Sequence, residues 1–180
     1  MFGKISKAKY AKILFDAILS ETDMLRAILN ENEICEKKLH VDPNAFPIVS
    51  IAFHLYAYRE MLAHKYEAKS VSSVITLCIE EWASRPTRLG MSERKRAFEK
   101  TYDSLCSSTE ESIKDNAVRF GTGFFDSLSI QVIALLFNDK QFDSLNEDEV
   151  LSLEPLANRI ADHFRNIGKN SKIMNLDAEM

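Results

Sequence analysis

The stretch REMLAHKY, residues 59–66, places an arginine, a histidine and a tyrosine close together in the chain. Four residues separate Arg59 from His64, and Tyr66 follows two positions later. A guanidinium stays positively charged at physiological pH, whereas an imidazole gains or loses a proton near neutrality. A titratable group and a fixed cation together supply what acid–base chemistry at a phosphodiester requires. These three residues are therefore the first candidates for a catalytic set.

The Arg-x4-His-x-Tyr pattern of this stretch resembles the signature of HEPN-type ribonucleases, which are small all-helical proteins of toxin–antitoxin and antiviral systems. The resemblance implies metal-independent cleavage of RNA, with the imidazole of His64 near the 2′-hydroxyl and Arg59 on the phosphate. It also implies a homodimer, because in the family two protomers bring their pairs together in one cleft. The resemblance covers eight of the 180 residues.

A structural role for Arg59 stays open beside the catalytic one. Arg59 falls in helical register with apolar residues such as Leu55 and Leu62, and a guanidinium in an apolar stripe needs a carboxylate partner. Glu80 or Glu81 of the following helix is the partner we expect. On an unbroken helix, five residues turn the chain through about 500°, which leaves Arg59 and His64 about 140° apart. The pair therefore converges only if the helix bends or ends between them, or if a second chain completes the site.

A second candidate site is the one concentration of positive charge, in the stretch SRPTRLGMSERKRAFEK. Such a cluster can contact phosphates or an acidic protein surface, and the alternative is an ordinary solvated helix face. The net charge of −4 does not indicate nucleic-acid binding by the chain as a whole. The candidate binding residues are Arg85, Arg88, Arg94, Lys95, Arg96 and Lys100.

The remaining histidines and cysteines predict no metal site and no cofactor. His54 lies in an apolar run, where a hydrogen-bonded core histidine is the expected role. Cys35, Cys78 and Cys106 are odd in number, widely spaced and without a Cys-x-x-Cys pattern, which disfavours structural zinc. Unpaired cysteines are typical of a reducing compartment, so we expect a cytoplasmic protein.

Helical periodicity dominates the chain and predicts a single all-α domain, a bundle of six to seven helices over residues 1–170, with a flexible tail at 171–180. Apolar residues surround the first half of the third helix nearly completely, so the third and sixth helices should lie at the centre. We expect a first helix before Thr22 and a second from Thr22 or Asp23 to about 39. The third and fourth should span about 45–68 and 71–84, the fifth should begin at Ser92, and the sixth should span about 113–138. The last should run from Pro155 to a cap at Gly168.

No segment of the sequence predicts a membrane span or a signal peptide. The longest apolar run, IQVIALLF at 130–137, is far shorter than a bilayer requires, and the N-terminal stretch lacks a continuous apolar segment. We therefore expect a small intracellular protein without catalysis of its own. It would bind a protein partner as an immunity, adaptor or phage/host-defence regulatory factor. The alternative is the HEPN-like ribonuclease, with RNA as its partner.

Overall fold

The computed structural model describes residues 5–41, 43, 45–85, 91–120, 123–137, 139–170 and 173, and these form helices and no strand. The predicted all-α bundle is thus confirmed. The six long helices are α1 (Lys7–Asn30), α3 (Ala45–Ala63), α4 (Ala68–Ala83), α5 (Met91–Phe120), α6 (Phe124–Leu136) and α9 (Glu154–Asn170). The described residues also form three short helices, α2 (Glu33–Lys37), α7 (Asp139–Phe142) and α8 (Glu147–Leu151).

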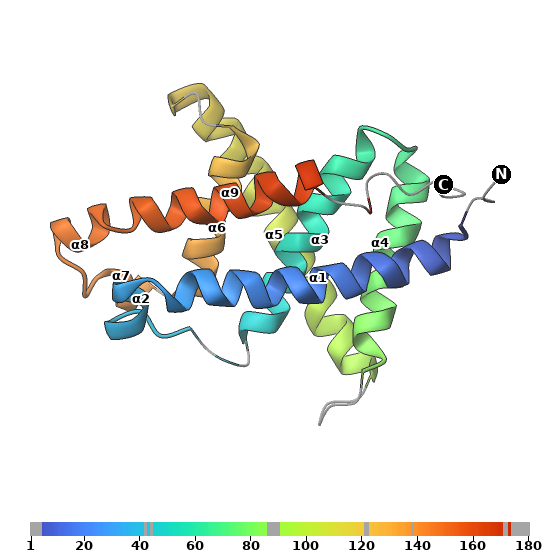
Figure 1. The fold of residues 1–180 in the computed structure, drawn as a ribbon, viewed down its shortest axis with the longest axis horizontal. Helices are drawn as coiled ribbons and strands as arrows, with labels where there is room; N and C mark the ends of the chain where they lie inside the picture. The colour runs from blue at the N-terminus through green and yellow to red at the C-terminus, as the bar shows by residue number, and fades with distance from the viewer. Residues whose placement is uncertain are drawn as a thin grey trace.

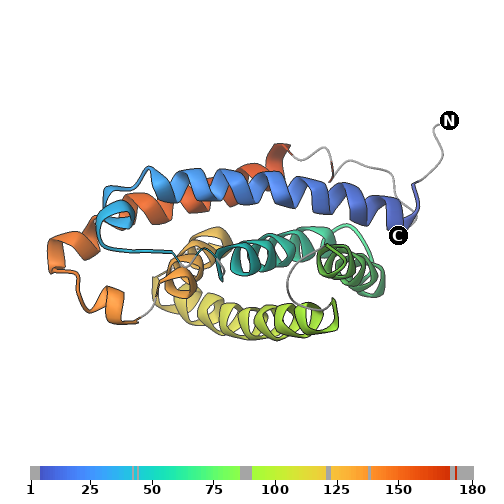
Figure 2. The same ribbon diagram turned by 90° about the horizontal axis from the view of Figure 1, so that it is seen from below.

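Helices α1 and α9 lie side by side and form one face of the molecule, with α3, α4 and α6 behind them and α5 on the far side (Figures 1 and 2). Helix α3 contacts α1, α4, α5, α6 and α9, so it occupies the centre of the bundle. Its residues 51–58 are all buried, as the continuous apolar run predicts. Because every face of this segment is covered, a polar side chain within residues 51–58 must find a partner inside the protein.

The first boundary that differs from the prediction is at Thr22. We expected Thr22 or Asp23 to cap a second helix, but α1 continues without a break to Asn30. Thr22 is buried, and its hydroxyl accepts a hydrogen bond from Ser50 Oγ of α3 at 3.2 Å. A threonine that is hydrogen-bonded to a neighbouring helix does not act as a cap, so the local signal is overridden by tertiary packing.

The second boundary that differs is the one between α5 and α6. We expected a helix at about 113–138, but α5 runs from Met91 to Phe120 and α6 begins only at Phe124. Gly123 precedes α6 in an extended conformation, and its N–H donates to the Asp126 carboxylate at 3.3 Å. The actual start of α6 is therefore a glycine with an acidic residue three positions on, which is a helix N-terminus signal.

The last helix begins at Glu154, which places Pro155 in the first turn as predicted. The predicted cap at Gly168 is wrong, because α9 continues to Asn170. Beyond it, Ile173 is buried, and its carbonyl oxygen accepts a hydrogen bond from the Tyr10 hydroxyl at 3.1 Å. No helix in the described part of the chain is both long enough and apolar enough to cross a bilayer.

The central position of α3 predicts unequal costs for two aromatic truncations. Phe53 of α3 is fully buried, so Phe53→Ala should lower the free energy of unfolding by about 3–5 kcal/mol. Phe124, at the start of α6, is only partly buried, so Phe124→Ala should cost less. Urea unfolding followed by circular dichroism measures both values. A loss at Phe53 no larger than that at Phe124 would contradict the described packing of α3.

Candidate functional site

Two buried histidines from distant parts of the chain meet between α3 and α9. His54 is fully buried, and His163 is 6% exposed. Their Nε2 atoms are 3.0 Å apart, and their ring centroids are 5.3 Å apart. The difference between those distances is about two ring radii, so the two nitrogens lie close to the line that joins the ring centres. That head-on approach is the geometry of a direct hydrogen bond between the two imidazoles.

The hydrogen bonds of His54 determine which nitrogens of the pair carry protons. His54 Nδ1 lies 2.7 Å from the carbonyl oxygen of Ser50, which can only accept, so Nδ1 is the donor. In the neutral ring His54 Nε2 is then an acceptor, and His163 Nε2 must donate to it. The other nitrogen of His163, Nδ1, is therefore an unprotonated acceptor. It has no hydrogen-bond partner among the described residues.

Burial keeps both imidazoles uncharged at neutral pH. The pKa of His54 is lowered to about 3, mainly by desolvation and secondly by the nearby His163. Desolvation also lowers the pKa of His163, to about 4. The ring of Phe164 packs against both imidazoles, at centroid distances of 5.1 Å and 5.3 Å. The pair is thus a neutral polar contact inside an apolar layer, and a proton added to it would be costly.

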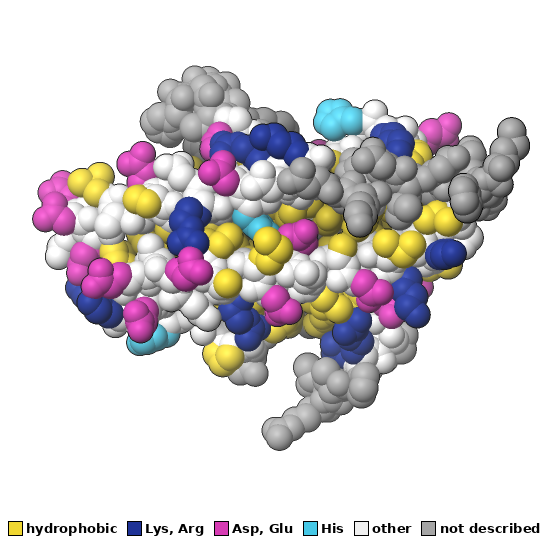
Figure 3. Space-filling model, in the orientation of Figure 1, with side chains coloured by type: hydrophobic (Ala, Val, Ile, Leu, Met, Phe, Trp, Pro, Cys, Tyr) yellow, Lys and Arg dark blue, Asp and Glu magenta, His cyan; other side chains and the backbone are white. Residues whose placement is uncertain are grey.

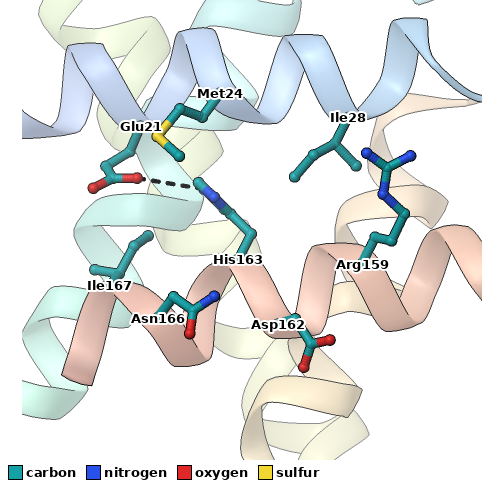
Figure 4. A pocket seen from close by; sticks show the side chains of 8 residues that line it. All are labelled: Glu21, Met24, Ile28, Arg159, Asp162, His163, Asn166 and Ile167. Carbon is teal, nitrogen blue, oxygen red and sulfur yellow. Dashed lines mark ion pairs between the residues drawn. The ribbon is translucent and has the colours of Figure 1, made fainter. Parts of the chain in front are cut away.

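His163 also lines a surface depression between α1 and α9, which we call the α1–α9 groove (Figure 4). The groove has a volume of about 420 Å³. In Figure 4 the ring of His163 reaches from α9 toward Glu21 of α1, and Glu21 Oε2 lies 3.9 Å from His163 Nε2. The lining residues are Glu21, Met24, Ile28, Arg159, Asp162, His163, Asn166 and Ile167.

Glu21 of α1 is the carboxylate that lines the groove beside His163 (Figure 4). Its side chain is 22% exposed, and burial raises its pKa. Among the described residues, His163 is the one basic side chain within 4 Å of the Glu21 carboxylate, and His163 is neutral at pH 7. The described part of the chain contains no group of three or more His, Cys, Asp or Glu side chains arranged to hold a metal ion. The groove therefore offers the Glu21 carboxylate beside apolar surface.

Arg59 does not pair with Glu80 or Glu81, so that prediction is wrong. Its guanidinium contacts Glu60 Oε1 at 2.7 Å and Glu110 Oε1 of α5 at 3.1 Å. Helix α5 packs along α3, which brings Glu110 within reach of Arg59. Glu80 instead forms an ion pair with Lys95, which is also on α5, and Lys95 Nζ lies 3.4 Å from Glu80 Oε1. The expectation that this arginine needs a carboxylate is correct, but the partners come from α3 itself and from α5.

Further contacts hold the guanidinium of Arg59 in place. It lies 4.7 Å from the ring centroid of Tyr56, and Nη1 donates to Cys106 Sγ at 3.4 Å. Arg59 and Glu60 also line a second depression, of about 440 Å³, against α4 and α5. His64 does not line that depression. No hydrogen bond or ion pair joins Arg59 to His64.

His64 and Tyr66 lie just past the end of α3. The helix ends at Ala63, so His64 and Lys65 form a turn and the imidazole of His64 is exposed. Tyr66 is partly buried, and the ammonium of Lys65 lies 5.0 Å from its ring centroid. The helix thus ends between Arg59 and His64, which is one of the conditions under which their side chains can converge.

Arg94 and Arg85, two members of the predicted basic cluster, make structural contacts. Arg94 is 6% exposed and stacks over the ring of Trp82 at 4.2 Å, while its Nη1 donates to the carbonyl oxygen of Arg85. The guanidinium of Arg85 lies 4.9 Å from the ring centroid of Phe15 and 4.0 Å from the Asp16 carboxylate. The buried position of Arg94 leaves it little surface to offer a partner.

The rest of the cluster is dispersed along α5. Lys95 is partly buried and paired with Glu80, while Arg96 and Lys100 are exposed. Arg88 lies outside the described residues. Binding of phosphates or an acidic surface by this cluster stays a prediction that depends on Arg96, Lys100 and the exposed side of Arg85.

Sequence reasoning did not identify His163 or Glu21 as candidates. It identified His54 as a hydrogen-bonded core histidine, which its two contacts confirm. One signal for His163 was present, because it falls three residues after Ile160 and four before Ile167 in the apolar stripe of α9. Its partner lies 109 residues away, and no local pattern indicates that pairing.

No protein-family model, curated protein or solved structure matches this chain. The resemblance of residues 59–66 to HEPN-type ribonucleases therefore stays a prediction from the sequence. The site is defined by its geometry alone, which is a neutral histidine pair beneath a groove where Glu21 has no oppositely charged partner among the described residues.

The histidine pair predicts a loss of stability in mild acid. The folded pKa values of His54 and His163 lie below the ordinary value of 6.5, so between about pH 6.5 and 4 the unfolded chain takes up protons that the folded chain does not. Each such proton lowers the free energy of unfolding by about 1.4 kcal/mol per pH unit. Glu21 acts in the opposite direction, because its pKa is raised in the folded state.

Two variants separate the histidines from the other groups that titrate in this range. In His163→Gln the amide can still donate to His54 Nε2 but cannot take up a proton. The slope of the free energy of unfolding against pH should therefore decrease by the contribution of about one proton. His64→Gln, which replaces an exposed imidazole, is the matched control and should change the slope far less. Denaturant unfolding between pH 7 and 5 measures the slopes. Equal slopes in wild type and His163→Gln would contradict the described pair.

Proposed function

We propose that this protein acts by binding another protein, and that the α1–α9 groove is its contact surface. The supporting observation is an apolar strip edged by charges along the seam between the two helices, on the face seen in Figure 3. Met24, which is 54% exposed, lines the groove together with Ile28 and Ile167. An apolar centre within a polar rim is the usual anatomy of a protein interface.

The rim of the groove carries charges of both signs. Arg159 of α9 pairs with Glu31 of α1, and Asp162 pairs with Arg165 at 2.8 Å. Opposed charges at a rim favour one orientation of a partner over others and contribute less to affinity than the apolar centre does. Methionine suits such a centre, because its flexible thioether adapts to the shape of a partner.

Within this class we propose an immunity, adaptor or phage/host-defence regulatory role in the cytoplasm. Cys35, Cys78 and Cys106 are all free and buried, which is compatible with a reducing compartment. A binding role does not require a convergent catalytic set. Arg59 is engaged by Glu60 and Glu110, which is what a structural arginine would show.

A metal-independent ribonuclease is the second candidate function, and one observation favours it. Helix α3 ends at Ala63, between Arg59 and His64, so the two side chains are not held on opposite sides of one continuous helix. The exposed imidazole of His64 is accessible to a second chain or to RNA. The ion pairs of Arg59 would have to open for its guanidinium to bind a phosphate.

The proposed binding surface predicts that a charge at Met24 abolishes partner capture. Tagged protein would be expressed in the source cell, crosslinked and recovered, and the partner quantified by mass spectrometry. Met24→Glu should reduce capture at least tenfold, because a carboxylate replaces an exposed apolar contact next to Glu21. Leu151→Glu, which alters a 66% exposed leucine on α8, is the matched control and should retain capture. Capture that is unaffected by Met24→Glu, with an unchanged circular dichroism spectrum, would refute the proposed surface.

The ribonuclease alternative makes a different prediction about Arg59 and His64. If the protein binds rather than cleaves, neither wild type nor His64→Ala should degrade RNA in the absence of metal, and expression of neither should be toxic. Arg59→Met should destabilise the fold by about 1 kcal/mol, through lost contacts with Glu60, Glu110 and Tyr56. If wild type cleaves RNA, and if His64→Ala and Arg59→Met both stay folded but lose that cleavage, residues 59–66 are an active site.

A further inference from the structure

Glu21 is a half-buried carboxylate for which the described residues supply no positive charge. Its side chain is 22% exposed. The basic group that lies near it is the imidazole of His163, whose Nε2 is 3.9 Å from Glu21 Oε2. His163 is neutral at pH 7 and already donates its Nε2 proton to His54. A carboxylate in this position weakens the fold, because it loses hydration without gaining an ion pair. A residue that costs stability at a surface groove is typical of a binding function.

The other charged groups of the groove each have an ion-pair partner. The guanidinium of Arg159 pairs with Glu31, which lies outside the groove lining. The Asp162 carboxylate is 68% exposed and accepts from Arg165 at 2.8 Å. Glu21 is therefore the charge that a bound partner would meet unpaired, and a cation is the group that it favours.

The Glu21 carboxylate can only accept hydrogen bonds, and the Nε2 proton of His163, the ring atom nearest to it, is already donated to His54. The tautomer fixed by His54 leaves His163 Nδ1 with a free lone pair, and both carboxylate oxygens of Glu21 accept. Among the common protein side chains, lysine and arginine carry only donors and a full positive charge. Their aliphatic stems pack on apolar surface while the charged end stays in a polar environment.

The apolar residues of the groove complete the match. Met24 of α1 and Ile167 of α9 line the same end of the groove as Glu21, and Ile28 lies toward Arg159 (Figure 4). We infer that the groove receives a lysine or arginine side chain of the partner protein, with its charged end at Glu21 and its stem against Met24 and Ile167. This inference rests on the proposed function, and it adds the chemistry by which the partner is recognised.

The butylammonium ion reproduces the end of a lysine side chain and is the first probe. Titration into the protein, followed by NMR of the histidine side chains, should shift the signals of His163 saturably while those of exposed His40 and His64 stay unchanged. Butanol, which has the same stem without the charge, should give no saturable shift. Glu21→Gln should weaken butylammonium binding about tenfold or more. Asp162→Asn, which removes the paired and exposed carboxylate of the same groove, should weaken it much less.

The stability of Glu21→Gln provides an independent measurement. Because the carboxylate is uncompensated, the variant should unfold at the same temperature as wild type or a higher one. A lowered melting temperature would mean that Glu21 stabilises the fold, and it would overturn the inference. Partner capture should also fall at least tenfold in Glu21→Gln, and it should persist in Glu33→Gln, which changes an exposed glutamate paired with Lys37.

The outcomes distinguish this inference from the proposed function. If Met24→Glu abolishes capture while Glu21→Gln retains it, the partner binds in the groove without a cation and only the inference fails. If neither variant affects capture, the proposed surface fails as well. If butylammonium binding depends on Glu21 but capture does not, the groove binds a free organic amine, and the assignment to a partner's side chain is overturned.

Discussion

The packing of α3 depends on satisfying the hydrogen bonds of one histidine in its buried segment, residues 51–58. His54 has two ring nitrogens, and neither can reach water. The Ser50 carbonyl satisfies Nδ1 from one turn earlier, but Nε2 requires a second helix, which is α9 through His163. The Ser50 hydroxyl in turn donates to Thr22 of α1. Three helices thus converge on one chain of hydrogen bonds, and this fixes how α1 and α9 lie over α3.

The charged residues show how much of the apparent functional chemistry the fold itself uses. Arg94, which by its sequence context belongs to a basic surface, is buried against Trp82. Arg59, the most distinctive residue of the chain, is held by Glu60 and Glu110. Guanidinium groups suit such positions, because they stack on aromatic rings and donate hydrogen bonds to several carboxylates at once. A cluster of arginines in a sequence is therefore weak evidence for a binding surface until their burial is known.

Glu21 contrasts with those arginines, because the described residues supply it with no opposite charge. Its position follows from the same three-helix contact, since His163 can face Glu21 only when α9 is held beside α1. The neutral state of the histidine pair supplies no positive charge to the Glu21 carboxylate. The core hydrogen bond and the proposed binding chemistry are therefore linked through one side chain, that of His163.

The sequence by itself determined the helical class, the long apolar α3 at the centre and the need of Arg59 for a carboxylate. These follow from the 3.6-residue period and from the cost of burying a charge, which are local properties of a segment. Only the tertiary structure decided that α1 continues through Thr22, because the hydroxyl is taken by Ser50. The same holds for the partners of Arg59 and for the meeting of Glu21, His54 and His163. Contacts between residues as far apart in the sequence as His54 and His163 depend on how the helices pack against one another. The spacing of residues within one helix does not predict that packing.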